Sequence, residues 1–165
     1  MAAALPAQND TWWHLRAGAD TLQGLDPFVD RYSWTVRGQF YWNHSWLAQV
    51  ILYAAYAVGG LPLATAICVA SITAGWWLVW RRCRGPALER LLLLGVAVSV
   101  ATITWSLRPQ VFSILLLPIA VELVARNHRV GVAVLMALWA NLHAGFMYGV
   151  IVLVAGIGTS LVDRE

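Results

Sequence analysis

The chain contains no lysine and few charged residues of any kind. All of its basic residues are arginine, and charged residues make up 12% of the sequence, whereas an ordinary globular protein is about a quarter charged. Hydrophobic residues make up 60% of the chain, and its mean hydropathy is +0.66. This composition indicates that water is not the main solvent of the protein and that most of the chain lies in lipid.

The motifs of soluble enzymes are also missing. The chain has no Walker loop, no GxGxxG turn, no HExxH helix and no CxxC pair, so nucleotide, zinc-protease and thiol redox chemistry lack their usual motifs. Its arginines form short runs beside apolar segments, without the basic stripe typical of nucleic-acid binding, and we expect no nucleic-acid partner. Cys68 lies in an apolar run and Cys83 in an arginine cluster, so we expect no disulfide between them.

Long apolar runs separate the charged clusters, which predicts an all-α polytopic membrane protein. A membrane-spanning helix needs about 20 apolar residues, and residues 61–80 form such a run, closed by tryptophans and arginines. Residues 46–60 are apolar but shorter and end at two glycines, so we expect a helix lying at the membrane interface. Residues 61–162 are then predicted to contain about five transmembrane helices, at 61–80, 88–107, 111–125, 130–142 and 145–162.

Residues 1–45 are polar and aromatic and contain no run that could cross a bilayer, so we predict a loop domain outside the membrane. Within it, Asn9 is a plausible N-cap for a helix that continues to about Leu22, because its side chain can accept a hydrogen bond from an amide of the first turn. Arg16 and Asp20 would then form an ion pair one turn apart.

The second half of this loop contains turn residues and aromatic residues. Asp26 and Asp30 flank a proline and a phenylalanine, and aspartates in such positions usually build turns. Residues 32–42 carry aromatic and β-branched side chains on both sides of Gly38. This pattern predicts two short strands joined by a turn.

The arginine clusters predict the orientation of the chain. If the clusters at residues 81–90 and 126–129 are cytoplasmic, the predicted spans alternate consistently through an inner (plasma) membrane. Three segments then share the extracytoplasmic side: residues 9–45, the turn at Arg108, and the turn at residues 141–145. These segments contain three of the four histidines.

Asp10 and His14 are the candidate catalytic residues. A carboxylate at a helix N-terminus is favoured by the helix dipole and stays ionised, so Asp10 suits either a metal ligand or a general base. His14 follows on the same helical face. The alternative is that Asp10 only caps the helix and His14 makes an ordinary polar contact.

Four further polar residues near the predicted outer membrane edge are candidates for substrate binding. Arg108 could bind a phosphate, or its side chain could extend to the interface. His143 and Asn141 lie at a membrane edge, where polar groups are costly unless they face a cavity, a partner or water. His44 follows an aromatic run and could face the same pocket as Asp10, or anchor the chain at the interface.

Four segments carry a resemblance to known proteins: DTWWHLRAG, DRYSWTVRGQFYWNHSWLAQ, WSLRPQVFS and LWANLHAGF. They look like motifs of uncharacterised bacterial membrane proteins. The order of elements resembles the first extracytoplasmic loop and the following spans of GT-C glycosyltransferases, which include protein O-mannosyltransferases, aminoarabinose transferases and oligosaccharyltransferase catalytic subunits. The proteins with that layout have a span before the acidic loop, so the resemblance implies a fragment of a longer chain.

The resemblance implies a function for several residues. Asp10 matches the acidic residue of the first loop in that superfamily, which binds a divalent metal such as Mg²⁺ or Mn²⁺ or acts as a base on the acceptor. Some relatives carry a second acid where this chain has Arg108, Pro109 and Gln110. We therefore expect part of a GT-C-like glycosyltransferase that takes its sugar from a polyprenyl-phosphate donor in the membrane. The alternative is a non-catalytic polytopic protein, such as a transporter subunit or an assembly partner.

Overall fold

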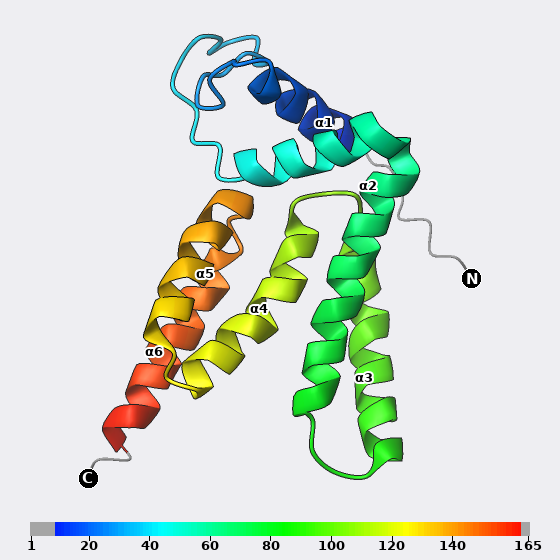
Figure 1. Ribbon diagram of the computed structural model, residues 1–165, viewed down its shortest axis with the longest axis vertical. Helices are drawn as coiled ribbons and strands as arrows, with labels where there is room; N and C mark the ends of the chain where they lie inside the picture. The colour runs from blue at the N-terminus through cyan, green and yellow to red at the C-terminus, as the bar shows by residue number, and fades with distance from the viewer. Residues whose placement is uncertain (1–8, 163–165) are drawn as a thin grey trace.

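The computed structural model describes residues 9–162, and over this range the chain is helical with no named strand. The elements in chain order are α1 (Asn9–Leu22), α2 (Trp46–Arg82), α3 (Ala87–Ala101), the 3₁₀ helix η1 (Thr102–Thr104), α4 (Gln110–Ala125), α5 (Arg129–Leu142) and α6 (Phe146–Val162). Figure 1 shows that α1 and the first part of α2 lie across one end of a bundle formed by the remaining helices. The predicted all-helical fold class is confirmed.

Helix α2 consists of two arms that meet at a break. Gly59 and Gly60 have non-helical backbone angles, and Gly60 has φ 63°, a conformation that strains a residue with a side chain. Pro62 follows in the first turn of the second arm, where its missing N–H removes no intrahelical hydrogen bond. The first arm, residues 46–58, packs beside α1, and the second turns into the bundle (Figure 1). The break falls at the glycines that end the predicted interfacial helix.

The core runs from α1 and the first arm of α2 through the second arm of α2 to α4 and α5. Trp139 is fully buried there, and the backbones of α2 and α4 approach closely, because a Cβ added to Gly75 would lie 2.4 Å from the carbonyl oxygen of Ile114. Helix α3 contributes no buried residue to this core. Cys68 is buried and Cys83 is half-buried, and both are free, as predicted.

The helix connections alternate between the two ends of the bundle. The α2–α3 and α4–α5 connections lie at one end, and α1, the α3–α4 turn and the α5–α6 turn lie at the other (Figure 1). At the first end Arg82 and Arg126 both bind Glu122. The segments that we predicted to share a side of the membrane therefore share an end of the molecule, while the orientation in the membrane stays a prediction.

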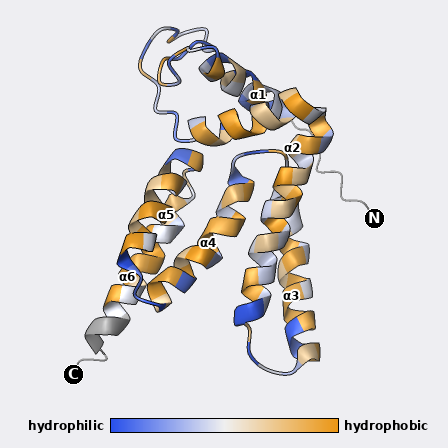
Figure 2. Cartoon of the chain, in the orientation of Figure 1, coloured by the Kyte–Doolittle hydropathy of each residue, from blue (hydrophilic) through white to orange (hydrophobic). Residues whose placement is uncertain are grey.

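Two helices in the described range are long and apolar enough to cross a membrane, namely the helix Trp46–Arg82 and the helical stretch Ala87–Thr104. Three further apolar helices are shorter, at Gln110–Ala125, Arg129–Leu142 and Phe146–Gly158. Figure 2 shows hydrophobic residues along all of these helices, with hydrophilic residues gathered near their ends. Membrane association is thus supported, and the number of about five spans stays a prediction.

The second predicted span is helical over a shorter stretch than expected. We predicted residues 88–107, and α3 ends at Ala101 with one 3₁₀ turn after it. The hydroxyl of Thr102 donates to the Ser99 carbonyl at 2.7 Å, and that of Thr104 donates to the Ala101 carbonyl at 2.8 Å. Such bonds compete with the helical backbone pattern.

Helix α1 and the loop after it agree with the predictions for this region. Within α1, Arg16 and Asp20 form the expected ion pair, with Nε and Oδ1 3.0 Å apart. Gly24 follows the helix in the left-handed region at φ 85°. Asp26 then accepts a hydrogen bond from the backbone N–H of Phe28 at 2.8 Å, which confirms its role in a turn.

The predicted hairpin within residues 32–42 is wrong. The described residues contain one isolated antiparallel bridge, between Val29 and Phe40. Asp30 explains the difference, because its side chain accepts hydrogen bonds from the backbone N–H groups of Tyr32 at 2.9 Å and Ser33 at 2.8 Å. Asp30 still pairs through its backbone with Gly38 and Gln39, and this Asx turn then bends the chain away, so the pairing ends there.

Candidate functional site

An ion pair joins the start of α1 to the turn before α4. The Asp10 carboxylate and the Nη2 atom of Arg108 lie 2.6 Å apart. The neighbouring residues reinforce this contact, because the hydroxyl of Thr11 donates to the carbonyl of Leu107 at 3.2 Å in a buried position. The Asp10 side chain is 56% exposed and that of Arg108 only 27%, so the carboxylate lies at the rim of the site and the guanidinium deeper.

His14 lies against the first arm of α2 through a buried amide. Its Nδ1 is 3.2 Å from Nε2 of Gln49. The oxygen of the same Gln49 amide accepts a hydrogen bond from Nδ2 of Asn43 at 2.9 Å, and Asn43 in turn accepts one from the backbone N–H of Ser45 at 3.2 Å. Gln49 is 1% exposed, so α1, the loop and α2 are tied together by a chain of buried polar contacts.

His143 has a second set of partners on the other side of the site. Its Nδ1 accepts a hydrogen bond from the backbone N–H of Gly145 and lies 2.9 Å from the hydroxyl of Ser113. That hydroxyl accepts a bond from the indole N–H of Trp139 at 2.9 Å. The α5–α6 turn is thereby fastened to α4, since Ser113 belongs to α4 and Trp139 to α5.

Asn141 and His44 are held differently from the other predicted residues. The Asn141 carbonyl accepts a hydrogen bond from the indole of Trp46 at 2.7 Å, and its amide donates to the Ala137 carbonyl at 2.8 Å. Asn141 therefore links α5 to the first arm of α2, which is a packing role. His44 donates its backbone N–H to the Trp42 carbonyl at 3.2 Å.

The predicted site residues are close enough to influence one another electrostatically. Burial lowers the pKa of His14 to about 4, Asp10 opposes this effect, and Arg108, His143 and His44 add to it. Burial and His44 also lower the pKa of His143. The structure thus brings Asp10, His14, His44, Arg108 and His143 to one end of the bundle, with both shifted histidines neutral at pH 7.

The low pKa of His14 predicts a loss of stability in acid. The pKa falls from an ordinary 6.5 to about 4 in the folded protein, so the unfolded chain binds the proton more tightly. The stabilisation is complete above pH 6.5, is lost as the pH falls toward 4, and amounts to roughly 3 kcal/mol. Thermal unfolding in detergent at pH 7 and pH 4.5 should therefore show a smaller pH dependence for His14→Gln than for the wild type.

The control for that measurement is His128→Gln, because His128 is exposed in the α4–α5 connection, where its Nδ1 caps α5 by accepting a hydrogen bond from the backbone N–H of Gly131. This variant should keep the acid sensitivity of the wild type. An equal loss of stability in the wild type and in His14→Gln would contradict the assignment.

Several residues of the site were not found from the sequence. Gln49, Asn43 and Ser113 connect the predicted histidines to their surroundings, and none was singled out. Gln49 offered a signal, because it is the only strongly polar side chain in residues 46–58, and a buried polar group in an apolar helix is costly unless it has a specific partner.

The donor set around Asp10 does not favour a divalent metal. Among the described residues, no group of three or more His, Cys, Asp or Glu side chains is arranged to hold a metal ion. The guanidinium of Arg108 lies against the Asp10 carboxylate and opposes the approach of a second cation. A metal at Asp10 stays a prediction from the resemblance.

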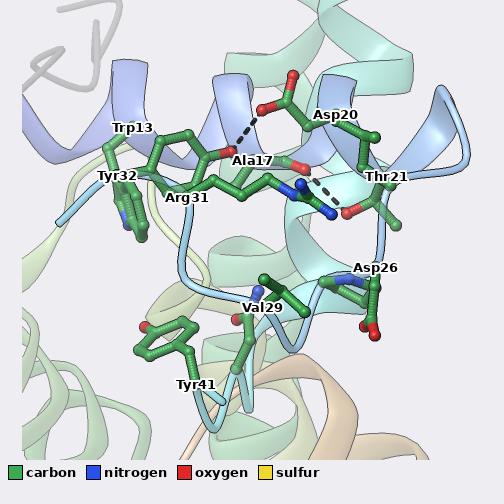
Figure 3. A pocket seen from close by; sticks show the side chains of 12 residues that line it. Trp13, Ala17, Asp20, Thr21, Asp26, Val29, Arg31, Tyr32 and Tyr41 are labelled. Atoms are coloured by element: carbon green, nitrogen blue, oxygen red, sulfur yellow. Dashed lines mark hydrogen bonds between the residues drawn. The ribbon is translucent and has the colours of Figure 1, made fainter. Parts of the chain in front are cut away.

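A separate small cavity lies under the loop after α1 and is lined by none of the predicted site residues. Its volume is about 20 Å³, enough for about one water molecule. Figure 3 shows the Tyr32 hydroxyl at this cavity bound to the Asp20 carboxylate, a contact of 2.7 Å. The cavity is too small for a sugar, so the region around Asp10 and Arg108 remains the candidate functional site. No protein-family model, curated protein or solved structure matches the chain.

Proposed function

We propose that this chain is part of a GT-C-like glycosyltransferase that moves a sugar from a polyprenyl-phosphate donor to an acceptor at the outer membrane face. The observation that carries the proposal is the pairing of Asp10 with Arg108 at 2.6 Å beside His14. A carboxylate and a guanidinium that can bind phosphate then lie together at the end of a bundle of apolar helices. A lipid-linked donor and a water-soluble acceptor can meet there.

Arg108 is suited to the donor phosphate. One of its nitrogens, Nη2, holds Asp10, while its Nε is buried and has no hydrogen-bond partner among the described residues. A buried N–H without an acceptor is costly, and a phosphate oxygen would satisfy it with a charge-assisted hydrogen bond. Arg108 can therefore stabilise the negative charge of the polyprenyl phosphate that leaves during transfer.

A groove between α2 and α4 supports a donor with a hydrophobic chain. It has a volume of about 510 Å³ and an almost entirely apolar lining. Its residues on α4 run from Ile114, in the second turn of the helix, to Val121, and those on α2 run from Gly75 toward the end of the bundle that carries Arg82. A prenyl chain could lie in this groove while its phosphate meets Arg108. Its lining residues are Gly75, Trp76, Val79, Arg82, Cys83, Ile114, Leu117, Pro118 and Val121.

Asp10 is suited to activate the acceptor. In the proposed step the Asp10 carboxylate takes the proton of the acceptor hydroxyl, and the acceptor oxygen forms a bond to the anomeric carbon of the sugar. The bond between that carbon and the phosphate oxygen breaks, and polyprenyl phosphate leaves with its charge facing Arg108. The exposure of Asp10 leaves its carboxylate within reach of an acceptor from the aqueous side.

The proposal is tested by replacing Asp10 with Asn in the full-length protein and measuring transfer from a labelled polyprenyl-phosphate sugar. We expect turnover to fall by about 100-fold or more, because the amide cannot take a proton. The matched control is Asp26→Asn, which keeps the oxygen that accepts the turn hydrogen bond and should retain activity. Unchanged turnover in Asp10→Asn would remove the catalytic role.

The alternative is a non-catalytic membrane protein in which Asp10 fastens α1 to the bundle. The ion pair with Arg108 favours it, because this contact has a structural use without any substrate. The two functions predict different results when the charges of Asp10 and Arg108 are exchanged: a transferase loses sugar transfer, and a structural ion pair keeps its role.

A further inference from the structure

The hydrogen bonds that lead from Ser45 through Asn43 and Gln49 to His14 have a defined direction, because the first donor is a backbone N–H. The N–H of Ser45 can only donate, so the side-chain atom of Asn43 that it meets at 3.2 Å is the carbonyl oxygen. The Asn43 amide nitrogen must then face Gln49, where it donates to Oε1 at 2.9 Å. All three residues are buried, with exposures of 6%, 5% and 1%.

The same reasoning determines the hydrogen on His14. Because Oε1 of Gln49 accepts from Asn43, the Gln49 nitrogen points at Nδ1 of His14, 3.2 Å away. An amide NH₂ group is a donor only, so Nδ1 must be unprotonated and accept. The neutral His14 ring then carries its hydrogen on Nε2.

We propose that Asn43 and Gln49 are positioning residues that hold His14 in the neutral tautomer with its hydrogen on Nε2. His14 then serves the site as a hydrogen-bond donor to an anionic oxygen and not as a general base. The donated hydrogen is fixed by buried groups from the loop and from α2, so it does not depend on the substrate. The ligand class that this arrangement suits is a phosphate or another oxyanion held jointly by Arg108 and His14.

The surrounding charges agree with this assignment. The titratable and charged groups that act on His14 are Asp10 on its own helix, His44 from the loop, Arg108 from the α3–α4 turn and His143 from the α5–α6 turn. Burial and three of these four groups oppose a positive charge on the ring. A protonated His14 would also place an N–H against the Gln49 amide nitrogen, where two donors would meet.

His143 provides an internal reference for the tautomer. Its Nδ1 accepts from the backbone N–H of Gly145 at 2.9 Å, so its neutral ring also carries the hydrogen on Nε2. This assignment involves neither Asn43 nor Gln49.

The test is a nitrogen NMR measurement on the full chain labelled with ¹⁵N-histidine in detergent micelles. In the wild type at pH 7, the nitrogen shifts of His14 should identify Nε2 as protonated and Nδ1 as unprotonated, with no exchange between tautomers. His14→Gln identifies the signals. A wild-type His14 with its hydrogen on Nδ1, or with both tautomers populated as in a free histidine, would overturn the proposal.

Two variants of Gln49 test the positioning role. In Gln49→Glu the carboxylate can only accept, so the hydrogen of His14 should move to Nδ1 and the pKa of the ring should rise. In Gln49→Met the donor is removed without adding a charge, and both tautomers of His14 should appear. His143 should keep its hydrogen on Nε2 in both variants. An unchanged His14 tautomer in both variants would show that Gln49 does not set it.

The oxyanion-binding role rests on the proposed function, but the tautomer does not. If neither variant folds, the wild-type spectrum alone decides the assignment, because the opposite tautomer is incompatible with the hydrogen-bond chain. The spectrum requires no substrate. Loss of the tautomer therefore contradicts the positioning role, while intact turnover in Asp10→Asn contradicts the catalytic role of Asp10 and an absence of transfer in the wild type contradicts the transferase, so the failures are distinguishable.

Discussion

Replacing Gly18 by alanine is expected to lower the free energy of unfolding by about 2–3 kcal/mol. A Cβ at this position would lie 2.1 Å from the carbonyl oxygen of Gln49 and 2.8 Å from Cβ of Tyr53. The first contact is with backbone, which cannot rotate away, so α1 must move off the first arm of α2. Thermal unfolding in detergent would measure the loss.

The control for Gly18 is the same substitution at Gly95 on α3. A Cβ there would meet no atom within 4 Å, and alanine is favoured over glycine inside a helix by up to about 1 kcal/mol. Gly95→Ala should therefore leave stability unchanged or raise it. If Gly18→Ala were equally well tolerated, α1 and α2 could not pack as closely as described.

The Gly18 substitution should also disturb the candidate site. His14 lies one turn before Gly18 on the same helix, and the clash involves the residue that contacts the His14 ring. Displacement of α1 should lengthen the contact between Gln49 and His14 and weaken the pairing of Asp10 with Arg108. The His14 nitrogen shifts in Gly18→Ala should then report both tautomers.

Exchanging the charges of the ion pair should restore stability without restoring transfer. Asp10→Arg alone brings two guanidinium groups together, and Arg108→Asp alone brings two carboxylates together, so each should destabilise the protein by about 1 kcal/mol. The double variant can form the pair again. Its thermal stability should recover toward that of the wild type, while its sugar transfer stays at least about 100-fold lower.

The double variant separates the two candidate functions. A transferase needs a carboxylate at position 10 to take a proton and a guanidinium at position 108 to bind a phosphate. The exchange abolishes both. A protein that uses Asp10 and Arg108 only to fasten α1 should behave normally with the charges reversed. Recovery of transfer together with stability would therefore contradict the catalytic role.

Local sequence signals were sufficient to predict a break or a turn where one residue type determines the backbone conformation. The glycines at 59 and 60 ended the first arm of α2 because glycine tolerates conformations that other residues avoid. Asp26 accepted the turn hydrogen bond that its position beside a proline predicted. The strand prediction for residues 32–42 failed because the aromatic pattern was weighed above the side chain of Asp30, which accepts hydrogen bonds from the next turn of backbone.

The grouping of the candidate site was predicted only as far as its side of the membrane. Alternation of the arginine clusters indicated that Asp10, Arg108 and His143 share one end, and they do (Figure 1). Their partners could not be predicted in the same way. Contacts between α1 and the α3–α4 turn join residues far apart in the sequence. No local sequence pattern in either segment predicts that it contacts the other.

The sequence by itself determined that the chain is helical and apolar, where most of its helices begin and end, and which end carries the polar residues, because these properties follow from local composition and periodicity. Only the tertiary structure decided that Arg108 pairs with Asp10, that Asn141 packs against Trp46, and that Gln49 faces His14. The reason is physical: the partner of a buried polar group is chosen by the packing of whole helices, and the direction of its hydrogen bonds by every donor and acceptor enclosed with it.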